Sequence, residues 1–268
     1  MEVHLQSFGS RLRVRDGLFE VTVPDLSGSN YHVQEQIAAH EVESILLSPG
    51  TSSSSDALLL ALQNGVDVVV TDAFGNPQGR LFSNRPSSTL TIWKKQLVLA
   101  LTPEAVEIAK GWIETKLRER IHFLQTLKRY RSADKQALID TAVAGMADYL
   151  AKIGALAVRN PAKDAEKIRG FEGQAGQIYF DTLANLLPRE YHFKGRNFRP
   201  ATDLFNVFLN YGYGILNRRV EKALVLAGIH PYIGWMHTDG YQRKSLVFDF
   251  VEPYRIWVDK TVFRLLSA

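Results

Sequence analysis

The first 85 residues alternate between hydrophobic and polar side chains, which is the pattern of β-strands that bury one face. The alternation is regular over residues 10–15 and again over residues 18–23. Asp16 and Gly17 stand between these two runs, and an Asp-Gly pair is typical of a two-residue hairpin turn. The sequence therefore predicts an antiparallel hairpin in this part of the chain.

Aliphatic residues run together at 44–47 and 66–70, and both runs are predicted to be strands. Between them, a leucine-rich segment predicts a helix over 54–63 that ends at Gly65. Residues 1–86 are therefore predicted to form a small β-rich N-terminal domain.

The serine-rich segment 48–53 before that helix has two interpretations. A helix N-terminus can bind a phosphate, but this segment contains neither the lysine of a P-loop nor the spaced glycines of a dinucleotide fingerprint. We therefore expect it to cap the helix rather than to bind an anion.

From about residue 90 onward, apolar residues recur at helical spacing, so residues 90–268 are predicted to form a larger all-α domain. Helices are predicted at 102–130, 134–155, 171–187 and 203–228. The first of these should bury one apolar side, made of Ile108, Trp112, Leu117, Ile121, Leu124 and Leu127. The predicted fold class is therefore α+β, with the β-rich domain first and the all-α domain second.

Composition excludes several classes of protein and of site but does not identify a function. The chain has 268 residues, a net charge of +4 and no cysteine, so disulfides and thiolate metal sites are excluded. No apolar run approaches the roughly 20 residues that span a bilayer, and no secretory signal is visible. We expect a cytoplasmic protein without a membrane partner, whose basic charge permits a polyanionic ligand.

Glu172 is the first candidate for chemistry, because it lies in a helical segment that also contains Gly173 and Gly176. Each glycine inside a helix costs roughly 1 kcal/mol relative to alanine, so close packing or access for a ligand is expected there. The alternative is a packing helix with a solvated glutamate, and this segment alone favours it.

A polar stripe follows the helix predicted at 203–228. Asn206, Asn210, Tyr213 and Asn217 recur at spacings of four, three and four, which places them on one face. Arg199 belongs to a run of basic residues just before this helix. The stripe and the basic run could line a hydrophilic cleft that binds phosphates, but the stripe could equally face water.

The third candidate segment contains His237, Asp249 and Glu252. One interpretation is a helix cap, with Asp249 as N-cap and Glu252 reaching back to it. The other is a hard-cation site of carboxylate oxygens with one imidazole. Spacing alone does not decide between them.

Taken together, four blocks in this order resemble the CRISPR-associated spacer-acquisition integrase family. They are residues 169–173 with 179–180, residues 198–200 with Asp203 and Asn206, residues 209–213 with 228–231, and His237 with 245–246 and 249–255. The β-rich start followed by a helical remainder also fits that family. Its members usually continue with further helices after the last block, whereas this sequence ends at Ala268.

The resemblance implies a Mg²⁺ or Mn²⁺ ion held by Glu172, His237 and Glu252, with Asp249 in or beside the site as a fourth catalytic residue. It implies an enzyme that inserts foreign DNA fragments into a CRISPR array, by attack of a fragment 3′-hydroxyl on the repeat backbone. Hydrolysis by water would be its nuclease reaction.

The same resemblance implies double-stranded DNA as ligand, both as fragment and as repeat target. It also implies a homodimer formed through the β-rich domain of residues 1–86, which is thus the expected dimerisation domain, and a small partner protein of the adaptation complex that bridges two such dimers. Five residues are candidates for binding substrate, namely Arg255, Ser245, Asn206, Tyr213 and Arg199. Two alternatives stay open, namely a metal-dependent DNase that does not integrate and a catalytically silent DNA-binding scaffold.

Overall fold

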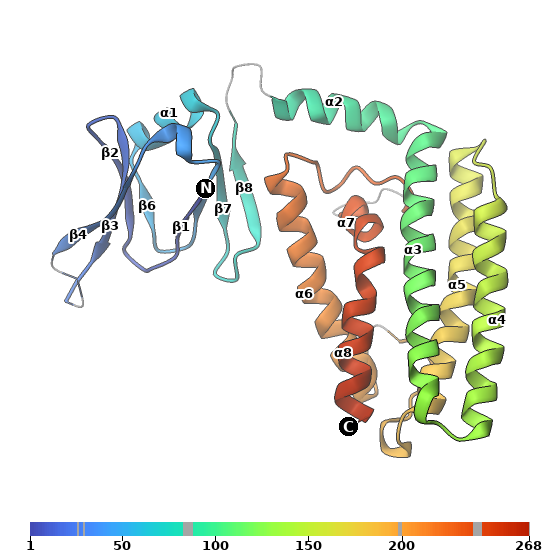
Figure 1. Ribbon diagram of the computed structural model, residues 1–268. Helices are drawn as coiled ribbons and strands as arrows, with labels where there is room; N and C mark the ends of the chain where they lie inside the picture. Colours follow the sequence, from blue (N-terminus) through green and yellow to red (C-terminus); the bar gives the residue numbers. More distant parts are fainter. Residues whose placement is uncertain (26, 29, 83–87, 198–199, 238–242, 268) are drawn as a thin grey trace. The chain divides into compact units, whose positions relative to one another are not determined.

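The structure is a computed structural model, and it describes residues 1–268 except 26, 29, 83–87, 198–199, 238–242 and 268. The chain divides into two compact units (Figure 1). The first contains Met1–Lys94 and Glu221–Ile229, and the second contains Lys95–Val220 and His230–Ala268. The α+β class with a β-rich first part and helices after it is confirmed. The unit division falls after Lys94, and the segment 221–229 returns to the first unit.

Two four-stranded sheets make up most of the first unit. One has the strand order β1-β5-β7-β8 and the other has the order β4-β3-β2-β6. The strands are β1 (Glu2–Leu5), β2 (Arg11–Arg15), β3 (Leu18–Pro24), β4 (Tyr31–Ile37), β5 (Ser44–Leu47), β6 (Ser52–Ser53), β7 (Asp67–Thr71) and β8 (Pro77–Leu81). A short 3₁₀ helix, η1 (Ala39–Glu41), precedes β5.

The predicted hairpin is confirmed, because β2 and β3 pair antiparallel from Arg15 and Leu18 onward. Asp16 and Gly17 form the connecting turn with φ values of 51° and 77°. Two consecutive positive φ values are what a type I′ turn requires. Phe19 of β3 is fully buried in the core of this unit.

Helix α1 (Ser55–Asn64) packs beside the strands, and a serine side chain caps its N-terminus. The Ser54 side chain accepts a hydrogen bond from the Ala57 N–H at 3.2 Å. Gly65 ends the helix with a φ of 70°. The capping residue is thus Ser54 and not one of residues 48–53, of which Ser52 and Ser53 form the short strand β6.

The C-terminal end of the long helix α6 (Leu204–Leu226) belongs to the first unit because side chains of that unit bind its backbone. Arg80 of β8 donates to the Val225 carbonyl at 3.1 Å, and Trp93 donates to the Gly228 carbonyl at 2.9 Å. These bonds satisfy carbonyls that a helix end leaves without partners.

The second unit is helical. Its helices include the end of α2 (Ser88–Ala100), α3 (Pro103–Leu127), α4 (Ala133–Ala155), α5 (Pro161–Leu186), most of α6, α7 (Ser245–Phe250) and α8 (Arg255–Ser267). Three short 3₁₀ helices connect them, namely η2 (Lys128–Tyr130), η3 (Arg189–Tyr191) and η4 (Glu252–Tyr254). Within the described residues, none of the helices has the length and apolar character needed to cross a membrane.

Two sequence expectations about these helices are wrong in detail. Helix α5 begins at Pro161, ten positions before the predicted start at 171, because the Asn160 side chain caps it by accepting from the Lys163 N–H. Ile108 of α3 was expected on the buried side, but it is 37% exposed.

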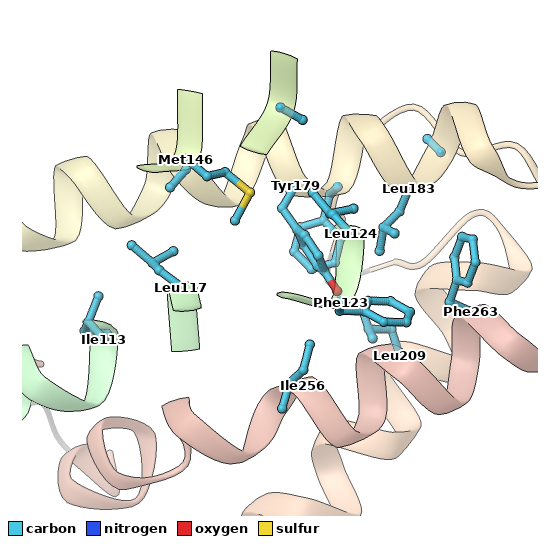
Figure 2. Close-up of a cluster of buried hydrophobic side chains, with 14 of the residues drawn as sticks. Ile113, Leu117, Phe123, Leu124, Met146, Tyr179, Leu183, Leu209, Ile256 and Phe263 are labelled. Carbon is cyan, nitrogen blue, oxygen red and sulfur yellow. The ribbon is translucent and has the colours of Figure 1, made fainter. Parts of the chain in front are cut away.

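The core of the second unit is filled by side chains from several of its helices (Figure 2). Figure 2 shows Leu117 of α3, Tyr179 of α5 and Ile256 of α8 pointing into one shared interior. All three are buried to 1% exposure or less. Packing of this density transmits the position of one helix to its neighbours, so the residues at the helix surfaces beside this core are held in fixed relative positions.

Helices α6 and α8 approach closely at Gly212, which predicts a position-specific sensitivity to alanine. A Cβ on Gly212 would lie less than 3.0 Å from Cγ1 of Val258, whereas a Cβ on Gly214 would meet nothing within 4 Å. We expect Gly212→Ala to lower the free energy of unfolding by about 1–3 kcal/mol through overpacking. Gly214→Ala is the matched control and should be neutral or stabilising by up to about 1 kcal/mol. Urea unfolding of both variants measures this, and equal effects would contradict the close approach.

Candidate functional site

A pocket of about 580 Å³ opens in the second unit between side chains of α3, α5, α6 and the segment from 252 onward. Its wall combines acids with bases. The carboxylates of Glu172 and Glu252 and the imidazole of His237 line it, together with the basic residues Lys116, Arg120, Lys194, Arg196 and Arg255.

Glu172 and Glu252 are brought together by one ammonium group. Lys116 Nζ of α3 donates to Glu172 Oε1 of α5 at 2.5 Å and to Glu252 Oε2 of η4 at 2.5 Å. Lys116 and Glu252 are buried, while the Glu172 side chain is 27% exposed to the pocket. Two carboxylates that lie 80 positions apart in the sequence therefore face the same point in space.

Glu252 is held in its charged form by two cations. Burial by itself would raise the pKa of this carboxyl, but the nearby charges of Arg255 and Lys116 and the hydrogen bond from Lys116 lower it to about 2. Arg255 Nε lies 3.1 Å from Glu252 Oε1. Glu252 is therefore a carboxylate at neutral pH, as a metal ligand must be.

His237 is oriented by Asp249, which is almost completely buried. Asp249 Oδ1 accepts from the His237 Nδ1 at 2.5 Å and from the His237 backbone N–H at 3.0 Å. Its Oδ2 accepts from the backbone N–H groups of Trp235 and Met236 at 2.6 and 3.0 Å. A carboxylate on Nδ1 fixes the tautomer that leaves Nε2 as the free nitrogen for a cation.

A second buried ion pair lies one helical turn beyond Lys116. Arg120 Nε donates to Asp259 Oδ2 of α8 at 3.1 Å, and the Tyr213 hydroxyl of α6 donates to the other Asp259 oxygen. The Arg120 guanidinium also lies over the ring of Tyr179 at 4.6 Å from its centroid. This cluster ties α3, α5, α6 and α8 together, and two of its members, Arg120 and Tyr213, line the pocket.

The basic side of the pocket is positioned by asparagines of the polar stripe. Arg196 donates to Asn206 Oδ1 at 2.8 Å and to Asn210 Oδ1 at 2.5 Å. Asn206 is fully buried and also donates to the Gly195 carbonyl at 3.0 Å. The stripe therefore faces the protein, and Asn206 holds the segment that carries Arg196.

The two glycines of α5 keep one wall of the pocket open. Gly173 and Gly176 both line it, and a Cβ on Gly173 would meet nothing within 4 Å. The cost of placing these two glycines in a helix is thus associated with access of a ligand to Glu172. For Gly173, close helix packing is not the reason.

The helix-cap interpretation of the third segment is wrong. Asp249 lies inside α7, and η4, which begins at Glu252, has no side-chain cap. The Asp249 carboxylate instead binds backbone N–H groups of residues 235–237, which lie before the helix.

The predicted substrate residues fall in three places. Arg255 and Tyr213 line the pocket. Ser245 and Asn206 are buried and do not line it, since Ser245 packs at the start of α7 against Gly234 and Asn206 binds Arg196. Arg199 lies outside the described residues.

The donors present fit a hard divalent cation, although a lysine lies where it would bind. Across the described ranges, no three His, Asp or Glu side chains form a ready-made metal-binding group. Lys116 Nζ instead pairs with both carboxylates, at 2.5 Å from one oxygen of each. Two carboxylates that converge on one cation, with an oriented imidazole on the same pocket, are nevertheless the ligand types that Mg²⁺ and Mn²⁺ accept.

Sequence reasoning missed two important residues, namely Lys116 and Arg120, whereas Arg196 belongs to the basic run before the 203–228 helix, for which phosphate binding was one interpretation. A signal for Arg120 was present, because it lies three positions after Leu117 and four before Leu124, on the apolar stripe of α3. A charged residue on such a stripe requires a buried counter-ion. Nothing in the spacing indicated that the counter-ion would be Asp259.

Comparison with known proteins gives a consistent picture. Residues 3–268 match the family model described as CRISPR associated protein Cas1. A protein from Archaeoglobus fulgidus named CRISPR-associated endonuclease Cas1 1 is 30% identical over 277 aligned positions, which cover all of this chain and 78% of that protein.

Two solved structures share the fold. A structure titled "Casposase bound to integration product" superposes with a TM-score of 0.75 at 22% identity, covering 99% of this chain and 76% of the other. One titled "Partial Cas6-RT-Cas1--Cas2 complex" superposes with a TM-score of 0.69 at 22% identity and the same coverages. At these identities the likeness is one of fold.

The hydrogen bonds that Asp249 accepts predict that two aspartate substitutions lower the free energy of unfolding by different amounts. In Asp249→Asn, an amide NH₂ replaces an oxygen that accepts backbone N–H groups, so we expect the free energy of unfolding to fall by about 2–3 kcal/mol. Asp148→Asn removes an exposed pair with Lys152 and should cost less than about 1 kcal/mol. Urea unfolding of both variants in the absence of added metal measures this. Comparable losses would show that Asp249 is not the acceptor on which residues 235–237 depend.

Proposed function

The chain belongs to the family CRISPR associated protein Cas1, and from this we propose that it is a metal-dependent DNA integrase and endonuclease. In this proposal it inserts foreign DNA fragments as new spacers into a CRISPR array. The observation that carries the proposal is the pocket in which Glu172, Glu252 and His237 meet beside a basic wall. Metal-dependent phosphodiester chemistry requires carboxylates that hold the metal ion and basic side chains that bind the phosphates, and both must lie around the same pocket.

Glu172, Glu252 and Nε2 of His237 would hold the Mg²⁺ or Mn²⁺ ion. When bound, that ion would polarise the phosphodiester and stabilise the charge developing on its oxygens. Asp249 would act through His237, since its contact with Nδ1 keeps the imidazole turned toward the site. We therefore assign Asp249 as a positioning residue of this reaction.

Arg255 and Arg196 would bind the phosphates of DNA on the basic side. Both guanidiniums are fixed from behind, Arg255 by Glu252 and Arg196 by two asparagines. A guanidinium in a fixed orientation can donate two parallel hydrogen bonds to one phosphate. This would align the scissile phosphodiester without any covalent bond to the protein.

The proposed reaction is a transesterification. The 3′-hydroxyl of the fragment loses its proton to solvent and forms a new bond to a phosphorus of the repeat. The bond from that phosphorus to its original 3′-oxygen breaks, and the departing oxygen takes a proton from solvent to become a new 3′-hydroxyl. When water attacks instead, the same residues would give endonuclease cleavage.

The proposed partners are double-stranded DNA, a second copy of this chain and a small partner protein. The solved complex whose title names Cas1 and Cas2 together supports the last of these. We propose that the β-rich unit forms the homodimer, as the family resemblance implied. The cytoplasmic location stays a prediction.

A second candidate function is a metal-dependent DNase that cuts without joining, which the endonuclease name of the Archaeoglobus relative favours. A catalytically silent scaffold is less well supported, because both carboxylates and the oriented imidazole are retained on one pocket.

A strand-joining assay tests the proposed function. A labelled duplex with free 3′-hydroxyls and a supercoiled plasmid would be incubated with the protein in Mg²⁺ or Mn²⁺, or in chelator. We expect metal-dependent joined products, and we expect Glu172→Gln and His237→Ala each to lower their rate about 10²-fold or more. The physical reason is the loss of charge stabilisation at the scissile phosphate.

Glu166→Gln is the matched control, because Glu166 lies on the same helix but is exposed. It should join strands within about twofold of the wild-type rate, since it touches nothing in the pocket. Cleavage without joining would favour the plain nuclease. No metal-dependent DNA chemistry with either ion would overturn both catalytic proposals and leave a DNA-binding scaffold.

A further inference from the structure

The ammonium of Lys116 lies at the position that the proposed function assigns to a divalent cation. Its Nζ is 2.5 Å from one oxygen of Glu172 and 2.5 Å from one oxygen of Glu252. Only 2% of Lys116 is exposed. A lysine is rarely buried to this degree unless its charge is paired, and here it is paired with two acids that come from different elements.

The two acids need a cation between them when no metal is bound. Glu252 is 5% exposed, and two like charges that face one point in a poorly hydrated site repel each other strongly. Lys116 offsets that repulsion and holds both carboxylates in the convergent arrangement. Its position thus preserves the geometry of the site in the metal-free protein.

The same contacts place Lys116 in conflict with the metal. Lys116 binds one oxygen of each acid, and the other oxygen of Glu252 lies 3.1 Å from Arg255 Nε. An ion that takes the two Lys116-bound oxygens as ligands must therefore take the place of Nζ. The pocket of about 580 Å³ beside Lys116 offers the ammonium a volume to enter, and the flexible stem of a lysine permits that movement.

Arg120 provides an internal contrast. It lies one turn further along α3 and binds Asp259, which is completely buried. Its guanidinium is also packed over aromatic rings at 4.6 and 4.9 Å. Arg120 is therefore fixed in the fold, whereas Lys116 binds Glu172, whose side chain is 27% exposed.

We propose that Lys116 is a tethered cation that keeps Glu172 and Glu252 convergent in the metal-free protein and competes with the divalent ion for them. This inference rests on the proposed function, because it presupposes that a divalent ion binds these carboxylates. In it, Lys116 is a positioning residue that sets the metal affinity of the site and prevents the two acids from separating before the ion arrives.

The decisive variant is Lys116→Gln, which removes the positive charge and keeps a side chain of similar size. We expect Mn²⁺ to bind this variant roughly tenfold or more tightly than the wild type by isothermal titration calorimetry, because the competing cation is gone. We also expect a lower Tm in chelator and a larger rise in Tm on addition of Mn²⁺. Lys152→Gln, which removes an exposed cation on α4, is the matched control and should change neither quantity.

The opposite results overturn the inference. If Lys116 serves only to hold helices together, its loss should weaken Mn²⁺ binding or leave it unchanged, since a loosened site binds no better. Wild-type protein that binds no Mn²⁺ or Mg²⁺ would instead sink the metal dependence of the proposed function and this inference together. Tight wild-type binding with unchanged affinity in Lys116→Gln would sink this inference alone.

A measurement on the unaltered protein keeps the inference testable if Lys116→Gln does not fold. Pulsed labelling with an amine-reactive reagent, mapped by mass spectrometry, would compare Lys116 with Lys110 in chelator and in Mg²⁺. Lys110 lies on the same helix and pairs with Glu107, away from the pocket. We expect labelling of Lys116 to rise several-fold with Mg²⁺ while labelling of Lys110 stays constant. Equal labelling of Lys116 in both conditions would contradict displacement.

Discussion

Lys116 and Arg120 lie one helical turn apart on α3, and both are buried with exposures of 2% and 3%. A buried charge without a counter-ion costs several kcal/mol, so α3 can pack only where acids meet it. Those acids come from three other elements, with Glu172 on α5, Glu252 on η4 and Asp259 on α8. The requirement to neutralise two cations therefore decides which elements surround α3, and both cations line the pocket.

This arrangement makes the candidate site a consequence of the fold rather than an addition to it. Glu252 and Asp259 lie seven positions apart, and each binds one of the two α3 cations. Asp249 has a comparable role in the segment before α7. Its carboxylate accepts hydrogen bonds from backbone N–H groups of that segment and from His237, and it thereby orients the imidazole. Residues far apart in the sequence are brought to one pocket because charged groups buried in a dense helical core must find partners.

Local features of the fold were predictable from the sequence, and long-range pairings were not. The Asp16-Gly17 turn and the Ser54 cap depend on neighbouring residues only, and both are present. The alternation and helical spacing also indicated the α+β class correctly. In contrast, the burial of the Asn206 stripe and the bridge from Lys116 depend on which helices become neighbours. Periodicity does not indicate which helices become neighbours, so the predicted metal ligands depended on the family resemblance. The orientation of His237 by Asp249 became visible only in the structure.

The two buried cations differ in chemistry as well as in position, and the difference bears on function. A guanidinium is planar and suits a fixed pair combined with aromatic stacking, which describes Arg120 between Asp259 and the rings of α5. An ammonium is a compact point charge on a flexible stem, which makes Lys116 the more exchangeable of the two. An arginine at 116 would bind the same acids with a rigid fork and would resist replacement by an ion. Arg120 is therefore the cation that stabilises the fold. Lys116, one turn away, is the cation that a metal ion can displace.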